Sequence, residues 1–210
     1  MVESFEEFTK KYTFLSRLEF FPEFSNCRGG KSKIFVVKDK DSKNNYICKR
    51  ILKNYLREEE FKIPLEINSD KVIQILGVYK SDDNYYYIIT PFNGKKDLLN
   101  YFEKNSHISE SKLKPYILEM AKCLKECHDH DIVHLDIKPE NYILVSNNPV
   151  KLQLIDFGFA QKIDGKIDRP LGTRDYCAPE IYDLKYSKAS DVWSLGISIY
   201  YIKNSEFPLD

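Results

Sequence analysis

The chain of 210 residues lacks a long apolar run and has no excess of charge of either sign. Lysine and arginine number 32, and aspartate and glutamate also number 32, so the formal net charge is zero. A chain without net charge has no overall field that would draw it to nucleic acid or to an anionic membrane. A transmembrane helix needs about 20 consecutive apolar residues. We therefore expect a soluble protein whose partners include neither nucleic acid nor membrane.

Cysteine is scarce, with five residues and no C-x-x-C pair. Cys123 and Cys127 lie one helical turn apart, a spacing that indicates packing more often than a metal site. The N-terminal residues 1–11 carry three glutamates and no apolar stretch, which argues against a signal peptide. These features predict a reducing intracellular compartment, cytoplasmic or nuclear.

The first part of the chain has the alternation that is typical of strands. A polar turn over 39–45 separates two of the segments and predicts a hairpin, and residues 54–67 form a charged pattern that predicts a helix. The strand-like segments lie at 34–37, 46–51, 72–79 and 85–90. Together they predict a small antiparallel sheet with one helix.

The pattern changes after residue 94. An amphipathic helix is predicted over 109–130, with one apolar stripe. Residues 191–202 are apolar nearly all the way round, which predicts a helix buried inside a lobe. The second part of the chain is therefore expected to be mostly helical, without internal repeats or low-complexity tracts.

Three motifs follow one another in the second part of the chain. They read His-Leu-Asp-Ile-Lys-Pro-Glu-Asn over 134–141, Asp-Phe-Gly over 156–158 and Ala-Pro-Glu over 178–180. One Asp-Phe-Gly alone is a weak signal, but the three in this order, followed by Asp-Val-Trp-Ser-Leu-Gly over 191–196, are very specific. Here the sequence resembles the eukaryotic protein kinase family, serine/threonine type.

The resemblance implies an α+β fold of two lobes. The N-terminal lobe, residues 18–90, would contain the antiparallel sheet and its helix. Residues 91–94 would form the hinge, and residues 95–210 would form a mostly helical but partial C-terminal lobe. The implied cofactors are ATP and Mg²⁺, and the implied substrate is a protein that bears serine or threonine.

The resemblance also implies a catalytic role for individual residues of the motifs. Phosphoryl transfer depends mainly on positioning and on neutralising the charge of the phosphate oxygens. Asp136 would accept the proton of the substrate hydroxyl, and Lys138 would reach the γ-phosphate from the same loop. Asp156 and Asn141 would supply oxygen ligands to Mg²⁺. The alternative is that Asp136 and Asp156 merely cap turns.

A strand lysine completes the predicted phosphate site. Lys49 matches the family lysine that binds the α- and β-phosphates, and it shares a strand face with Ile47. Its register with the later motifs favours this role over a solvated lysine. Glu60 is its best partner by spacing, although Glu58 and Glu59 are adjacent.

Further residues are expected around the adenine and ribose. Thr90 would line the back of the pocket, while Pro91 and Asn93 would present hinge backbone atoms. Ile47 occupies the position where the family has a small alanine. Its larger side chain would narrow the adenine-binding space opposite Ile143. Asp97 could meet the ribose, and an N-cap of the following helix is an equally good interpretation.

The glycine-rich loop of the family is degenerate in this chain. Residues 27–34 read Cys-Arg-Gly-Gly-Lys-Ser-Lys-Ile, in which only the middle glycine of the family pattern, Gly29, is kept. Glycines there allow backbone N–H groups to approach phosphates closely. Cys27 would stiffen the loop, and Gly30 would partly compensate, while Ile34 would cover the base. Nucleotide affinity is expected to be weaker, at the same location.

The segment after Gly158 lacks phosphorylation sites. Leu135 replaces the arginine that holds a phosphorylated loop in many family members, and no Ser, Thr or Tyr occurs between Gly158 and Gly172. We therefore predict a kinase that does not need phosphorylation of this loop. Thr173 is expected to hydrogen-bond toward Asp136 and Lys138.

The last residues, 207–210, follow directly after the predicted buried helix, whereas the family continues through further helices. Glu180 would then lack its usual arginine, and losing the partner of a buried carboxylate costs about 3–5 kcal/mol. A partner protein that completes the C-terminal lobe is one expectation. The alternative to an active enzyme is a catalytically weak or inactive kinase-like binding or scaffold module.

Overall fold

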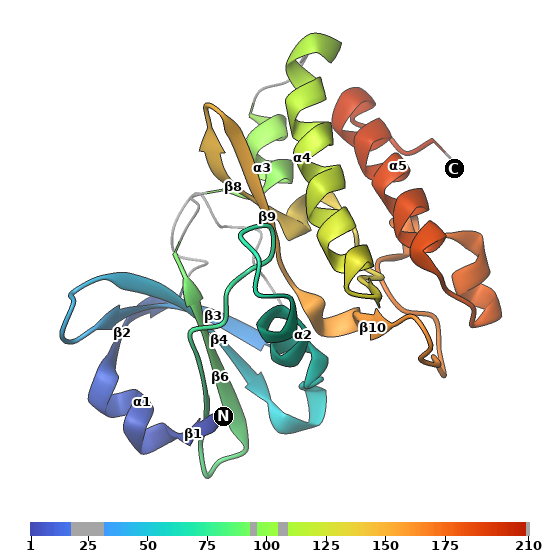
Figure 1. Cartoon of the computed structure of the whole chain (residues 1–210). Helices are drawn as coiled ribbons and strands as arrows, with labels where there is room; N and C mark the ends of the chain where they lie inside the picture. The colour runs from blue at the N-terminus through green and yellow to red at the C-terminus, as the bar shows by residue number, and fades with distance from the viewer. Residues whose placement is uncertain (18–31, 93–95, 105–108, 209–210) are drawn as a thin grey trace.

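The computed structural model describes residues 1–17, 32–92, 96–104 and 109–208, which form two lobes (Figure 1). The N-terminal lobe contains a six-stranded sheet with the strand order β1-β5-β6-β4-β3-β2. Its strands are β1 (Val2–Ser4), β2 (Tyr12–Arg17), β3 (Ser32–Asp39), β4 (Asn45–Leu52), β5 (Gly77–Lys80) and β6 (Tyr85–Pro91). Its helices are α1 (Phe5–Lys11), α2 (Glu59–Ile67) and the short 3-10 turn η3 (Lys53–Tyr55).

The predicted hairpin is present as β3 and β4, which pair antiparallel from Ser32 opposite Ile51 to Lys38 opposite Asn45. The turn between them is held by Asp39, whose carboxylate accepts hydrogen bonds from the backbone N–H groups of Asp41 and Ser42. β4 also pairs antiparallel with β6. This double pairing places β4 inside the sheet, where its alternate residues face the cleft.

The N-terminal residues belong to the same sheet, which the sequence had not predicted. β1 pairs with β5 in parallel, so the sheet is mixed and not purely antiparallel. Ser4 caps α1 by accepting a hydrogen bond from the N–H of Glu7. Phe8 of α1 is fully buried and packs among aromatic rings on the outer face of the sheet, namely Phe5, Tyr12, Phe14, Tyr79 and Tyr87.

Two predicted elements of this lobe are shorter than expected. The helix expected over 54–67 divides into η3 and α2, and the strand expected over 72–79 is regular only from Gly77. The physical reason for the second difference is a competing partner. Ile73 donates its N–H to the carbonyl of Leu154, and Leu154 donates to the carbonyl of Lys71, so residues 71–73 join the C-terminal lobe instead of β6.

The C-terminal lobe is mostly helical, as expected. Its described helices are α3 (Leu98–Glu103), α4 (Glu110–Asp129) and α5 (Lys188–Asn204), with 3-10 turns η4 (Pro139–Asn141), η5 (Phe157–Phe159), η6 (Arg174–Tyr176) and η7 (Pro179–Asp183). Its short strands are β7 (Ile132–Val133), β8 (Tyr142–Asn147), β9 (Val150–Leu154) and β10 (Gln161–Lys162). None of the helices in the described ranges is long and apolar enough to cross a bilayer.

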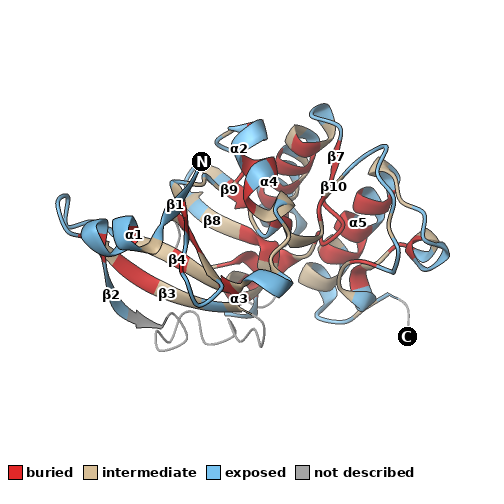
Figure 2. Ribbon diagram, turned by 90° about the horizontal axis from the view of Figure 1, so that it is seen from below, coloured by how far each residue is buried: buried red, intermediate tan, exposed pale blue. Residues whose placement is uncertain are grey.

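α4 forms the centre of this lobe. Met120 and Leu124 are buried on its inner face, in a core that also receives α3, α5 and the β8–β9 hairpin. Cys123 and Cys127 are both fully buried in that core, which confirms the prediction that they pack. In Figure 2 both α4 and α5 carry buried as well as exposed residues.

α5 is not buried all the way round, so that prediction was wrong. Leu195 and Ile197 face the core, whereas the side chains of Val192 and Trp193 are 56% and 40% exposed. α5 packs on α4, η6 and β7, while Val192 and Trp193 lie on its exposed side. The apolar composition of the helix thus exceeds the burial that the described residues provide.

Candidate active site

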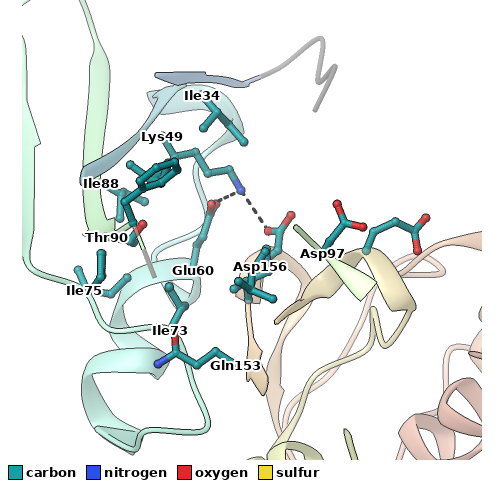
Figure 3. A pocket seen from close by; sticks show the side chains of 16 residues that line it. Ile34, Lys49, Glu60, Ile73, Ile75, Ile88, Thr90, Asp97, Gln153 and Asp156 are labelled. Atoms are coloured by element: carbon teal, nitrogen blue, oxygen red, sulfur yellow. Dashed lines mark hydrogen bonds and ion pairs between the residues drawn. The ribbon is translucent and has the colours of Figure 1, made fainter. Parts of the chain in front are cut away.

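A cavity of about 180 Å³ lies between the two lobes (Figure 3). One wall comes from β3, β4 and β6, and the opposite wall comes from β8 and the end of β9. Of the predicted nucleotide residues, those that line it are Ile34, Ile47, Lys49, Glu60, Thr90, Pro91, Asp97 and Ile143. Asp156 also reaches the cavity. Cys27, Gly29, Gly30 and Asn93 lie outside the described residues.

Lys49 joins three elements at the back of this cavity. Its Nζ lies 2.5 Å from a carboxylate oxygen of Glu60 on α2 and 3.1 Å from Oδ1 of Asp156 (Figure 3). Alternation along β4 points Lys49 into the cleft, and the turn of α2 brings Glu60 rather than its neighbours to the amine. Glu58 instead forms an exposed ion pair with Lys62. The structure therefore pairs Lys49 with Glu60, and Lys49 is not a solvated strand lysine.

Within this cluster, Lys49 and Asp156 each shift the pKa of the other toward its charged form. Burial alone would lower the pKa of Lys49, but the carboxylates of Asp156 and Glu60 outweigh burial and raise it. The Lys49 ammonium lowers the pKa of Asp156. Burial raises the pKa of Glu60, although Lys49 opposes that effect. The amine is thus cationic and Asp156 anionic at neutral pH.

A second cluster surrounds Asp136 in the loop between β7 and η4. Thr173 donates its hydroxyl to Oδ1 of Asp136 at 2.6 Å, and Lys138 donates to the same hydroxyl oxygen at 2.6 Å. The Lys138 amine also lies 3.0 Å from Oδ2 of Asp136. Asn141 donates its amide to that Oδ2 at 3.0 Å. Asp136 therefore binds side chains from separate segments, which disfavours the turn-capping interpretation, and the hydrogen bonds predicted for Thr173 are confirmed.

Asp191 supports this loop from α5. Its fully buried carboxylate accepts the backbone N–H groups of His134 and Leu135, both at 2.8 Å, and contacts Nε2 of His128 at 2.9 Å. Leu135 has a φ of 63°, in the left-handed region that is uncommon for a leucine. The buried carboxylate thus stabilises a strained backbone directly before Asp136.

For Asp97 the sequence left two interpretations open, an N-cap and a contact with the ribose. Asp97 is the N-cap of α3, because Oδ1 accepts the N–H of Asn100 at 2.8 Å and Oδ2 accepts the Asn100 side-chain amide at 2.6 Å. The capping interpretation is confirmed. The residue also lines the cavity, so a contact with a ribose stays a prediction.

Several cavity residues had no individual prediction. They are Ile73, Ile75, Ile88, Phe92, Glu140, Gln153 and Ile155. Ile73 and Ile75 flank the exposed Gln74, an alternation that could have identified them. Glu140 could not be identified by pattern. Burial raises its pKa, and its Oε2 has no hydrogen-bond partner among the described residues.

The carboxylate of the Ala-Pro-Glu motif has a local partner. Glu180 is half-buried and accepts a hydrogen bond from the hydroxyl of Ser190 at 2.6 Å. Ser190 also takes part in the capping box of α5 with Ser187. Glu180 thereby ties the end of the segment to the start of α5.

Comparison with known proteins agrees with this geometry. The family model for the protein kinase domain matches residues 27–210. Calcium-dependent protein kinase 22 of Arabidopsis thaliana is 30% identical over 93% of this chain and 41% of its own length. Serine/threonine-protein kinase PSK2 of Saccharomyces cerevisiae is 35% identical over 82% of this chain and 16% of its own. Dual specificity protein kinase TTK of Mus musculus is 32% identical over 86% of this chain and 23% of its own length. The chain thus spans less than half the length of each of these relatives.

Proposed function

The chain belongs to the protein kinase domain family, and from this premise we propose that it transfers the γ-phosphate of ATP to serine or threonine hydroxyls of proteins. The observation that carries the proposal is the Lys49–Glu60–Asp156 cluster at the back of the cleft. The cluster lines the same cavity that the Asp136 loop reaches through Glu140, so groups for binding phosphate and for accepting a proton lie on one cleft. A lysine two residues after Asp136 favours serine and threonine over tyrosine as acceptors.

The donor set fits Mg²⁺ and the phosphates of ATP. Mg²⁺ prefers oxygen ligands and is usually held by one or two carboxylates together with phosphate and water. The Asp156 side chain is 43% exposed toward the cleft, and the Asn141 amide donates its N–H₂ to Asp136, which leaves its oxygen for a metal. Asp156 and Asn141 would hold the ion, and Lys49 would bind phosphate oxygens. The bound nucleotide supplies the phosphoryl group.

Asp136 is the base in this proposal. Its carboxylate would accept the proton of the substrate hydroxyl, since it is held in place by Thr173, Lys138 and Asn141. Lys138, which contacts both Asp136 and Thr173, would offset negative charge as the phosphoryl group moves. Because each donor is already placed, little reorganisation is needed during the reaction.

We further propose that residues 18–90, 91–94 and 95–210 act as an N-terminal lobe, a hinge and a partial C-terminal lobe. β1 and β2, which come from residues 1–17, belong to the sheet of this N-terminal lobe. We propose that activity does not require phosphorylation of the loop between Gly158 and Gly172. The absence of Ser, Thr and Tyr from that loop supports this proposal.

Transfer of radiolabelled phosphate from ATP to a generic protein substrate tests the function. Asp136→Asn should lower the rate by about 10²- to 10⁴-fold while keeping nucleotide binding. Lys49→Met should weaken both nucleotide binding and transfer. Lys62→Met, which removes an exposed lysine on α2, is the matched control and should behave as the wild type.

The same measurements separate the enzyme from the alternative, a weak or inactive kinase-like scaffold. Nucleotide binding without transfer above the Asp136→Asn background would support the scaffold. An active wild type with the expected variant pattern would exclude it. Mass spectrometry of active protein that found a required phosphate on residues 159–171 would contradict the proposal on loop phosphorylation.

A further inference from the structure

Leu135 contacts the segment that carries Thr173 through its backbone. The N–H of Leu135 is fixed by Asp191, and its carbonyl oxygen faces Gly172. A Cβ at position 172 would lie 2.2 Å from that carbonyl oxygen, and Gly172 itself has a φ of 98°. The two chains therefore approach as closely as glycine permits, directly beside Asp136 and Thr173.

The side chain of Leu135 extends the same contact. It is 5% exposed and belongs to a cluster of buried apolar residues with Val133, Leu171, Ala178 and Ile181. Val133 ends strand β7 and Leu135 lies in the loop that carries Asp136, whereas the other three come from the segment around Thr173. The contact between catalytic loop and segment is thus apolar at its centre.

Leu171 and Ala178 bracket the turn that presents Thr173. Within this turn the thiol of Cys177 donates to the carbonyl of Leu171 at 3.3 Å, and Tyr176 donates its N–H to the carbonyl of Thr173 at 3.0 Å. Since both ends of the turn are anchored in the cluster and its interior is internally bonded, the position of Thr173 depends on the cluster.

We infer that Leu135 is a positioning residue: the apolar cluster around it holds residues 171–178, without a phosphate group, so that the hydroxyl of Thr173 stays on Asp136. The inference rests on the proposed function for its effect on rate. The attraction between Leu135 and the segment comes from dispersion and from the burial of apolar surface. This attraction does not depend on whether the segment is phosphorylated. The segment is held in the unmodified chain.

Leu135→Ala and Leu135→Met test the inference in the full chain. The alanine variant should increase hydrogen exchange in residues 163–178 and lower kcat by about ten- to a hundredfold, because Thr173 loses its position. Its Kd for ATP should stay within about twofold, since the Lys49 cluster is untouched. The methionine variant, which keeps an apolar side chain of similar volume, should restore both measurements.

Leu113→Ala is the matched control, because Leu113 is equally buried but lies on α4 in the main core. It should lower overall stability without a selective effect on residues 163–178. Leu171→Ala weakens the same cluster from the side of the segment and should produce the same increase in hydrogen exchange. It provides a second test if Leu135→Ala does not fold.

Unchanged exchange of residues 163–178 in Leu135→Ala and Leu171→Ala would overturn the inference. Equal loosening in Leu113→Ala would do the same, since the effect would then be general. A wild type without phosphate transfer would defeat the proposed function alone, because the exchange comparison still decides whether the cluster holds the segment.

Discussion

The amine of Lys49 lies 2.5 Å from the carboxylate of Glu60, and this ion pair joins the central strand β4 to α2. Both side chains are largely buried, with exposed fractions of 22% and 10%. The same amine reaches Asp156 of the C-terminal lobe. The position of α2 therefore determines how Lys49 is held between the lobes.

Glu60→Gln should weaken ATP binding by about tenfold or more. The substitution removes one of the two charges that orient Lys49, and a charged hydrogen bond of this kind contributes about 1.5–3 kcal/mol. A nucleotide titration followed by a transfer assay measures the effect. Glu58→Gln is the control, since Glu58 forms an exposed ion pair with Lys62, and this variant should bind ATP as the wild type does. Equal losses in both variants would argue against a specific role for Glu60.

The contribution of Asp156 to stability should depend on pH. Lys49 lowers its pKa in the folded state below the ordinary value of 3.8. The stabilisation is therefore present above the ordinary value and is lost as the pH falls through the lower folded pKa. The free energy of urea unfolding, measured without nucleotide, should differ between wild type and Asp156→Asn at neutral pH. That difference should shrink in acid.

A double-variant cycle isolates this effect. In a Lys49→Met background the charge that lowers the pKa of Asp156 is absent, so the pH dependence of the Asp156→Asn difference should largely disappear. A dependence that persists in that background would show that Lys49 is not its cause.

Two glycine-to-alanine substitutions should change the free energy of unfolding in opposite directions. Gly172→Ala introduces a Cβ against the carbonyl of Leu135 at a φ of 98°, and it should lower the free energy of unfolding by about 1–3 kcal/mol. Gly196→Ala, in the middle of α5 with open space around it, should raise it by about 0.5–1 kcal/mol. Urea unfolding measures both, and a stable Gly172→Ala variant would refute the close approach.

Asp191→Asn should be strongly destabilising. An amide can accept at only one atom, so one of the two buried N–H groups of His134 and Leu135 would lose its partner, at a cost of about 2–4 kcal/mol. Asp131→Asn is the matched control, because its carboxylate is 70% exposed and pairs with Lys188 at the surface. Its effect should stay below about 1 kcal/mol. Thermal unfolding of the two variants distinguishes a buried anchor from a surface pair.

The fold was predictable where periodicity and motifs agree. Alternation placed Lys49 on the cleft side of β4, and the apolar stripe located α4 within a residue of its ends. α1 and β1 were missed because the glutamates of residues 1–11 conceal Phe5 and Phe8, whose helical spacing and Ser4 cap are a short signal. The exposed side of α5 was missed because the apolar composition of a helix does not reveal whether another element packs on each of its sides.

The candidate site was predictable to the extent that it lies in contiguous motifs. Asp136, Lys138, Asn141 and Asp156 are spaced within short runs, so their grouping followed from the sequence. The choice among adjacent glutamates required the rotation of α2, which pattern alone does not fix. Glu140 and the Leu135 cluster depend on contacts between residues far apart in the chain, and no local period encodes them.

The outer aromatic layer has a practical consequence for recombinant work. The family match begins at residue 27, which suggests a convenient start for a shortened fragment. Such a fragment would lack Phe8 and Tyr12 and would bare the rings of Tyr79 and Tyr87, which are 2% and 4% exposed in the intact chain. A bare aromatic face on a sheet that has also lost both of its edge strands, β1 and β2, promotes self-association. A recombinant fragment should therefore include residues 1–17 and not start at residue 27.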